Sequence, residues 1–170
     1  IIDRPLWVLP RDLAAGPYQL MVNDISLAEI EIADVGRVFD APTVDVATGY
    51  QFGDAISLHG YTLNTDATID IELIWQAQAV LPTDYKVFVH LLDEAGEIIA
   101  QHDVMPRNWT YPTSLWAAGE YISDPYGFDA TEAAHAIRFG FYAQDTGTRL
   151  PIILNGASLE NNFVTITLKS

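Results

Sequence analysis

The chain has 170 residues, a length typical of one domain with a substantial hydrophobic core. Its formal charge is −15, with eight Lys and Arg residues against 23 Asp and Glu residues, which argues against nucleic acids and anionic lipid surfaces as partners. Cysteine is absent, so thiol nucleophiles, zinc ribbons and iron–sulfur clusters are excluded. The chain opens on "IIDRPLWVLP" without Met and contains no apolar run long enough for a membrane helix or signal peptide, so we expect a fragment of a longer polypeptide.

Apolar and polar residues alternate along much of the chain, which is typical of antiparallel β-strands with one buried face. In chain order the pattern appears in "LAEIEIA" (27–33), "TIDIELIWQ" (68–76), "AIRFGFYA" (136–143) and "FVTITLKS" (163–170). The first of these segments lies within residues 1–35, which echo the closing strands of the chain in pattern only. We therefore predict a β-sandwich domain over residues 36–170, preceded by strands (1–35) that end a similar module or form a packed extension.

Two hairpins are predicted in the second half of the chain. "YKVFVHLL" (85–92) is apolar on both faces and predicts a central strand, and "DEAGE" is a short turn into the returning strand "IIAQHD" (98–103). "YAQDTGTRLPI" (142–152) predicts a second hairpin that turns on Asp145-Thr146-Gly147. With about ten or eleven short strands, the sequence predicts an all-β fold, an antiparallel two-sheet β-sandwich of jelly-roll or immunoglobulin-like topology.

No motif in the sequence indicates catalysis. Asp145-Thr146-Gly147 matches the triplet of aspartic proteases, but those enzymes need two such carboxylates, and a single copy suits a hairpin turn. Nucleophile elbows, phosphate-binding loops and dinucleotide-binding fingerprints are absent from the sequence. The many Asp and Glu residues leave a polysaccharide hydrolase as a remote alternative, although no spacing selects a carboxylate pair. We therefore predict no catalytic residue and no enzyme activity for this chain.

The first predicted hairpin brings His90, Gln101, His102 and Asp103 near one another. Two imidazoles and a carboxylate suit a transition metal, but neighbours on a strand point to opposite faces, so His102 and Asp103 cannot both face His90. We predict a structural polar network of His90, Gln101 and Asp103 in place of a metal site. No cofactor is expected, and calcium held by loop carboxylates is the alternative that the acidic composition leaves open.

The stretch "QHDVMPRNWTYPTSLWAAGEYISD" (101–124) gathers aromatic and acidic residues between two predicted strands. Aromatic rings exposed in such a loop stack on the apolar faces of sugars, while acids and amides bind the hydroxyl groups. The same rings can instead cap one end of the sandwich, where prolines stiffen the crossing between the sheets. A glycan contact and a structural corner are therefore both open for four residues: Trp109, Tyr111, Trp116 and Tyr121.

Five segments resemble a known family: "GDAISLHGYTL", "IELIWQA", "DYKVFVHLLDEAGEIIAQHD", "YPTSLWAAGEYISD" and "GFYAQDTGTRLPI". They are similar to a module at the C-terminal end of large bacterial multi-pass membrane proteins that look like glycosyltransferases of the lipid-linked-sugar-dependent mannosyltransferase type. The resemblance covers roughly residues 53–168 and is most specific over residues 85–124. The loop "RNWT" (107–110) departs from it, because relatives tend to carry a smaller Gly-containing loop, and Trp109 therefore receives no family-wide role.

The resemblance implies an extracytoplasmic β-sandwich attached to a membrane enzyme whose sugar-transfer chemistry resides in the membrane part. It brings no catalytic residues to this chain. The expected function is a non-catalytic accessory domain that binds glycan or positions an acceptor, and the alternative is a purely structural or protein-interaction module without a ligand. The expected partners are a glycan or the membrane-embedded part of the same polypeptide, with no membrane insertion by this chain itself.

Overall fold

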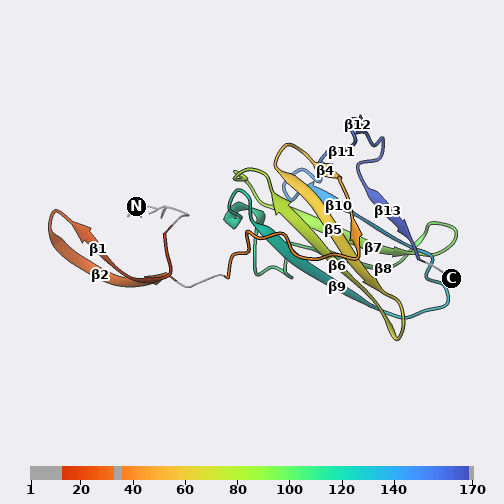
Figure 1. Ribbon diagram of the computed structural model, residues 1–170, viewed down its shortest axis with the longest axis horizontal. Helices are drawn as coiled ribbons and strands as arrows, with labels where there is room; N and C mark the ends of the chain where they lie inside the picture. Colours follow the sequence, from red (N-terminus) through yellow and green to blue (C-terminus); the bar gives the residue numbers. More distant parts are fainter. Residues whose placement is uncertain (1–12, 33–35, 169–170) are drawn as a thin grey trace. The chain divides into compact units, whose positions relative to one another are not determined.

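The computed structural model describes residues 13–32 and 36–168, and the chain divides into two compact units, residues 1–37 and 38–170 (Figure 1). The division falls at residue 37, where the sequence analysis places it at residue 35. Residues 1–12 of the predicted N-terminal strands lie outside the described residues. Within the described part, no helix is long and apolar enough to cross a membrane, and the helical segment that occurs is the 3-10 turn η1 (Thr113–Leu115).

The first unit contains a β-hairpin formed by β1 (Gly16–Val22) and β2 (Ile25–Ile32). Its two-residue turn, Asn23-Asp24, has positive φ at both positions, 47° and 63°, as a primed hairpin turn requires. The alternation in "LAEIEIA" therefore forms a strand through Ile32 as predicted. Ile25 and Leu27 are 65% and 57% exposed, so this hairpin buries little apolar surface.

The larger sheet of the second unit has the strand order β12-β11-β4-β5-β6-β9, and β3 also pairs with β5. Its strands are β3 (Val46–Ala47), β4 (Gln51–Phe52), β5 (Ile56–Asn64), β6 (Thr68–Ala77), β9 (Tyr121–Asp129), β11 (Ile152–Leu154) and β12 (Ala157–Ser158). A side chain at Gly60 would meet Val44 and the backbone of Val46 at 2.5 Å. Glycine at this position of β5 thus allows the segment before β3 to cross at close range.

The second sheet has the strand order β13-β10-β7-β8 and is antiparallel throughout. Its strands are β7 (Tyr85–Leu92), β8 (Ile98–Val104), β10 (Ala136–Ala143) and β13 (Val164–Thr167). β7 lies between β8 and β10, which confirms the prediction of a central strand from its apolar character on both faces. The turn into β8 is closed by Gly96, whose N–H donates to the Asp93 carbonyl at 3.0 Å.

The two sheets pack against each other around one hydrophobic core (Figure 1). Trp75 of β6 is fully buried and makes edge-to-face contacts with Phe52 and Phe141, at centroid distances of 5.3 and 4.7 Å. Phe52 comes from the larger sheet and Phe141 from the smaller one, so these rings join the two layers. The prediction of an all-β, antiparallel two-sheet β-sandwich is confirmed.

The predicted second hairpin is only partly correct. Asp145-Thr146-Gly147 does form a turn, in which Gly147 has a φ of 68° and donates to the Ala143 carbonyl at 2.8 Å. After one bridge between Tyr142 and Arg149, however, the chain leaves β10, and β11 joins the other sheet by pairing with β4. Pro151 has no N–H to extend the ladder, and its carbonyl accepts a hydrogen bond at 2.8 Å from Gly53, which directly follows β4 of the larger sheet.

Candidate functional site

Residues 101–124 carry the chain from one sheet to the other. β8 ends at Val104 in the smaller sheet, and β9 begins at Tyr121 in the larger one. Three successive residues, Arg107, Asn108 and Trp109, have φ values of 53°, 50° and 72°, a left-handed run that turns the chain sharply. The stretch is therefore the corner between the sheets that was one of its two interpretations, and residues 105–120 are called the corner below.

Asp124 links the corner to the hydrophobic core through hydrogen bonds. It is fully buried, and its Oδ2 accepts hydrogen bonds from the Trp75 indole N–H at 3.0 Å and the Tyr126 hydroxyl at 2.7 Å. Its Oδ1 accepts the backbone N–H of Arg107 at 2.7 Å. Burial raises the pKa of Asp124, and the hydrogen bonds from these donors oppose that shift. Both oxygens are thus occupied by structural donors.

Glu120 is a second buried carboxylate that accepts structural hydrogen bonds, at the other end of the corner. It is 2% exposed, and its two oxygens accept the Tyr111 hydroxyl and the Ala117 N–H, each at 2.8 Å. The Trp116 indole N–H donates to the Tyr111 carbonyl at 3.1 Å. These contacts explain why acids and aromatic residues gather in this stretch: they satisfy one another inside the protein.

The corner presents few of its aromatic rings to solvent. Tyr111 and Trp116 are 5% and 0% exposed, so the structure contradicts a glycan contact by either residue, because a buried ring offers no face to a sugar. Tyr121 is half-buried and packs edge-on against His59 at 5.1 Å. Trp109 is 48% exposed, and the Lys86 ammonium lies 4.7 Å from its ring centroid. A glycan contact therefore stays a prediction for Trp109 and Tyr121.

The residues of the predicted polar network lie on β7 and β8. His90 and Gln101 are opposite each other in the ladder, but Gln101 is exposed. His90 Nε2 lies 3.4 Å from Asp103 Oδ2, a contact that lacks the geometry of a well-formed hydrogen bond. Burial lowers the pKa of His90, Asp103 opposes this shift, and Arg138 and Arg149 add to it. A neutral imidazole is therefore favoured in the folded protein.

His102 points to the opposite side of β8 from Asp103. Its Nε2 lies 2.9 Å from the Gly127 carbonyl, and its ring packs 4.9 Å from Phe128 of the larger sheet. The prediction that His102 and Asp103 cannot both face His90 is thus confirmed. Among residues 13–32 and 36–168, no group of three or more His, Asp or Glu side chains is arranged to hold a metal ion.

A cluster on the solvent side of the smaller sheet was not predicted from the sequence. Val87 and Val89 belong to the core, so their neighbours on β7 point away from it. The ladders place Lys86 beside Tyr142, Phe88 beside Gly140, and His90 beside Arg138. We call this surface the outer face; its residues are Lys86, Phe88, His90, Gln101, Asp103, Arg138, Gly140, Tyr142 and Arg149. The alternation in "AIRFGFYA" already sets Arg138 and Tyr142 opposite the core, and this signal points to the cluster.

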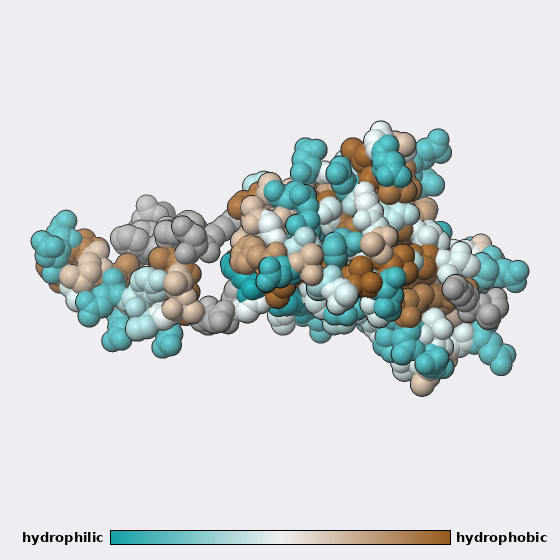
Figure 2. Space-filling view, in the orientation of Figure 1, coloured by the Kyte–Doolittle hydropathy of each residue, from teal (hydrophilic) through white to brown (hydrophobic). Residues whose placement is uncertain are grey.

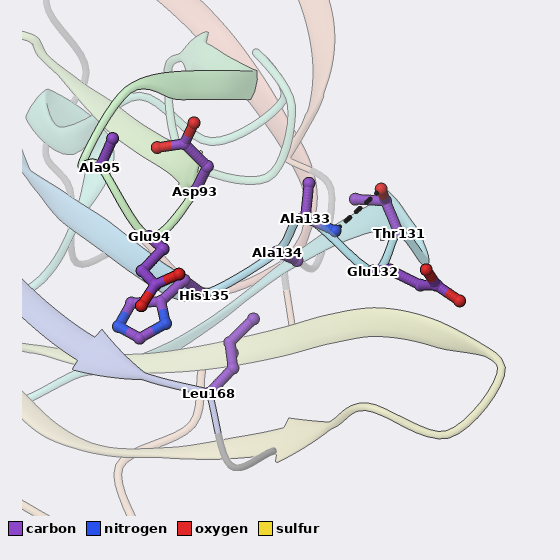
Figure 3. Close-up of a pocket in the computed structure, with 9 residues that line it drawn as sticks. All are labelled: Asp93, Glu94, Ala95, Thr131, Glu132, Ala133, Ala134, His135 and Leu168. Atoms are coloured by element: carbon purple, nitrogen blue, oxygen red, sulfur yellow. Dashed lines mark hydrogen bonds between the residues drawn. The ribbon is translucent and has the colours of Figure 1, made fainter.

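A surface pocket of about 800 Å³ opens at the end of the sandwich where the β7–β8 turn meets the segment before β10 (Figure 3). Asp93 and Glu94 of the turn and His135 line it, and the Asp93 carboxylate accepts the Glu97 N–H of the same turn at 2.8 Å (Figure 3). Thr131 Oγ1 accepts the Ala133 N–H at 3.4 Å, which is a local turn contact. This pocket contains carboxylates and one imidazole, but it offers no aromatic ring for a sugar.

Another pocket, of about 580 Å³, lies between β3, β5 and β13 and is lined by residues that include Val46, Tyr61, Leu154 and Ile166. The space-filling view shows apolar residues gathered in this part of the sandwich (Figure 2). Burial raises the pKa of Tyr61, with a further contribution from Tyr50, so its hydroxyl remains protonated at neutral pH. The lining has no nucleophile with an adjacent base, and a catalytic arrangement is not formed there.

In comparisons with known proteins, the chain matches no protein-family model, no curated protein and no solved structure.

Proposed function

We propose that this chain is a non-catalytic, extracytoplasmic accessory domain of a membrane-associated, glycosyltransferase-like protein, and that it binds glycan or positions an acceptor. The β-sandwich supports the proposal because its rigid layers hold loop side chains in fixed positions for a ligand. The connection to a glycosyltransferase rests on the resemblance of residues 53–168 to the C-terminal module of such proteins.

The proposal of glycan binding rests on the exposure of Trp109. The corner beneath it is fixed by the buried carboxylates of Asp124 and Glu120, yet Trp109 remains 48% exposed on a left-handed backbone. A large ring held at the surface by a rigid loop costs little conformational entropy when it binds, and its face suits the apolar side of a sugar ring.

A structural or protein-interaction module without a ligand is the second candidate. The burial of Tyr111 and Trp116 favours it, because two of the four rings considered for sugar contact are used to pack the corner. Under this alternative, Trp109 would contact a protein surface, such as the membrane-embedded part of the same polypeptide.

A glycan array followed by calorimetric titration of the bound glycans tests the proposal. We expect binding to a glycan and a loss of about tenfold or more in affinity for Trp109→Ala, because a sugar–aromatic stacking contact is removed. The matched control is Leu115→Ala, which removes an apolar side chain of the same 48% exposure from the same corner.

Equal weakening by both variants would indicate a general change in the corner and not a sugar contact. If no glycan on the array binds the folded protein, the glycan-binding proposal is wrong and the ligand-free alternative takes its place.

A further inference from the structure

The outer face concentrates positive charge in a strongly acidic protein. The described part of the chain contains five Lys and Arg residues: Arg37, Lys86, Arg107, Arg138 and Arg149. Three of these five, Lys86, Arg138 and Arg149, lie on the outer face. Since the whole chain has a formal charge of −15, this face differs in sign from most of the protein surface.

The two arginines are held by aromatic rings and not by acids. The Arg138 guanidinium lies 4.3 Å from the Phe163 ring centroid, and that of Arg149 lies 4.9 Å from Phe88. Stacking on the flat face of a guanidinium leaves its N–H edges free to form paired hydrogen bonds with an anion. The rings therefore fix the position of two cations without neutralising them.

Neither arginine has a carboxylate partner among residues 13–32 and 36–168. The Arg138 Nε is buried and donates no hydrogen bond there, and Arg149 Nη1 reaches only the Asn161 carbonyl, at 3.3 Å. The carboxylate of the outer face, Asp103, lies 3.4 Å from His90 Nε2 and contributes to the raised pKa of Tyr142, so it is directed toward these groups and not toward the arginines. A buried charged donor without a partner is costly, and an anion at Arg138 would satisfy it.

Gly140 makes room for the Phe88 ring beneath Arg149. A Cβ at Gly140 would lie 2.7 Å from the Phe88 ring, so glycine allows Phe88 to lie flat across β10. Phe88 is 2% exposed although it points away from the core between the sheets. The ring is thus a platform beneath Arg149, built into the sheet.

The surroundings of the arginines favour a saccharide over a peptide strand. β7 and β10 are paired on both sides, so their backbones offer no free edge to an added strand. Tyr142 is paired with Lys86 on one side and with Arg149 on the other. Lys86 also contacts the exposed Trp109. Lys86 and Arg149 therefore lie on the same side of the sheet, about 10 Å or two strand spacings apart, and the Lys86 ammonium lies 4.7 Å from the Trp109 ring centroid.

We propose that the outer face binds an acidic saccharide, whose carboxylate or sulfate groups pair with Arg138 and Arg149 while a sugar ring stacks on Trp109. This inference rests on the proposed glycan function and specifies the ligand class and the residues that select it. The anionic groups replace the missing carboxylate partners of the arginines, and the ring uses the one strongly exposed indole of the corner.

Calorimetric titration with four probes tests the proposal: a galacturonic acid tetrasaccharide, its methyl ester, a sulfated galactose tetrasaccharide and a peptide of aspartates. We expect an acidic tetrasaccharide to bind at least about tenfold more tightly than the uncharged ester, because each charge-assisted contact contributes about that factor. The two acidic sugars distinguish carboxylate from sulfate as the preferred anion. Arg149→Gln should weaken binding by about tenfold, whereas Arg37→Gln, with the same change in charge outside the outer face, should leave it unchanged.

Arg149 is exposed, so Arg149→Gln is expected to fold. It is the variant of choice because Arg138 is partly buried and its replacement could disturb folding. Equal affinity for an acid and its ester, or unchanged binding by Arg149→Gln, overturns the inference. Tighter binding of the aspartate peptide would assign the face to an acidic protein. If neutral glycans bind through Trp109 but acidic ones do not bind better, the glycan function stands and this inference falls; if no saccharide binds, both fall.

Discussion

The corner and the outer face both place charged side chains against aromatic rings, but they differ in how those charges are paired. In the corner, Asp124 and Glu120 are buried and accept hydrogen bonds from Trp75, Tyr126 and Tyr111. On the outer face, Arg138 and Arg149 lie against Phe163 and Phe88 with no carboxylate partner among the described residues.

This difference separates structural polar groups from groups that are available to a ligand. A cluster whose donors and acceptors satisfy one another contributes to stability, and its loss is felt as unfolding. An arginine without an ion pair in the protein contributes little to stability through its charge, so its replacement should mainly change binding. Variants of the corner and variants of the outer-face arginines should therefore differ in the property that they change.

The largest effect is expected for Trp116→Ala in the corner. This fully buried indole packs against the core and donates to the Tyr111 carbonyl, so its removal should cost about 3–5 kcal/mol of unfolding free energy. Urea denaturation followed by tryptophan fluorescence or circular dichroism measures the change. Trp109→Ala is the matched control, and its cost should stay below about 1 kcal/mol because the ring is exposed. Similar costs for the two variants would contradict the assignment of Trp116 to the core.

Asp124→Asn should have the next largest effect. Every polar group around this carboxylate is a donor, so an amide NH₂ would face either Arg107 N–H or the pair formed by Trp75 and Tyr126. Leaving a buried donor unsatisfied costs about 1–3 kcal/mol, and we expect a loss of that size in denaturant unfolding. Asp129→Asn, at the exposed end of β9, is the control and should be neutral. A neutral Asp124→Asn would show that the uncharged form is sufficient at this site.

Gly140→Ala tests the platform under Arg149. The added methyl group would lie 2.7 Å from the Phe88 ring, so the ring must tilt, at a cost of about 1–3 kcal/mol. Gly127→Ala, in the middle of β9, is the control, because its Cβ would meet only the end of the Asp70 side chain, which can move away. Thermal unfolding compares the two. If Gly140→Ala is as stable as the control, Phe88 does not lie against β10 as described.

Strand alternation predicts much of this fold but little of its side-chain chemistry. The two apolar faces of "YKVFVHLL" predict the central position of β7, and the period of two separates His102 from Asp103. The burial of Tyr111 could not be predicted, because it depends on a hydrogen bond to Glu120 that the local sequence does not specify. The position of Arg149 depends on the point where β11 changes sheets, and hairpin periodicity carries no signal for that change.

The smallest expected effect is a pH dependence that originates on the outer face. Burial lowers the pKa of His90 in the folded protein, whereas the unfolded chain has an ordinary value of about 6.5. The unfolded state then binds more protons in this range, so the free energy of unfolding should fall as pH decreases from about 6.5 through the lower native pKa. His90→Asn should remove this part of the slope between about pH 7 and 5 in urea titrations. Asp103→Asn should make the slope steeper, because Asp103 supports the protonated imidazole while Arg138 and Arg149 oppose it. An unchanged slope in both variants would mean that His90 titrates as it does in the unfolded chain.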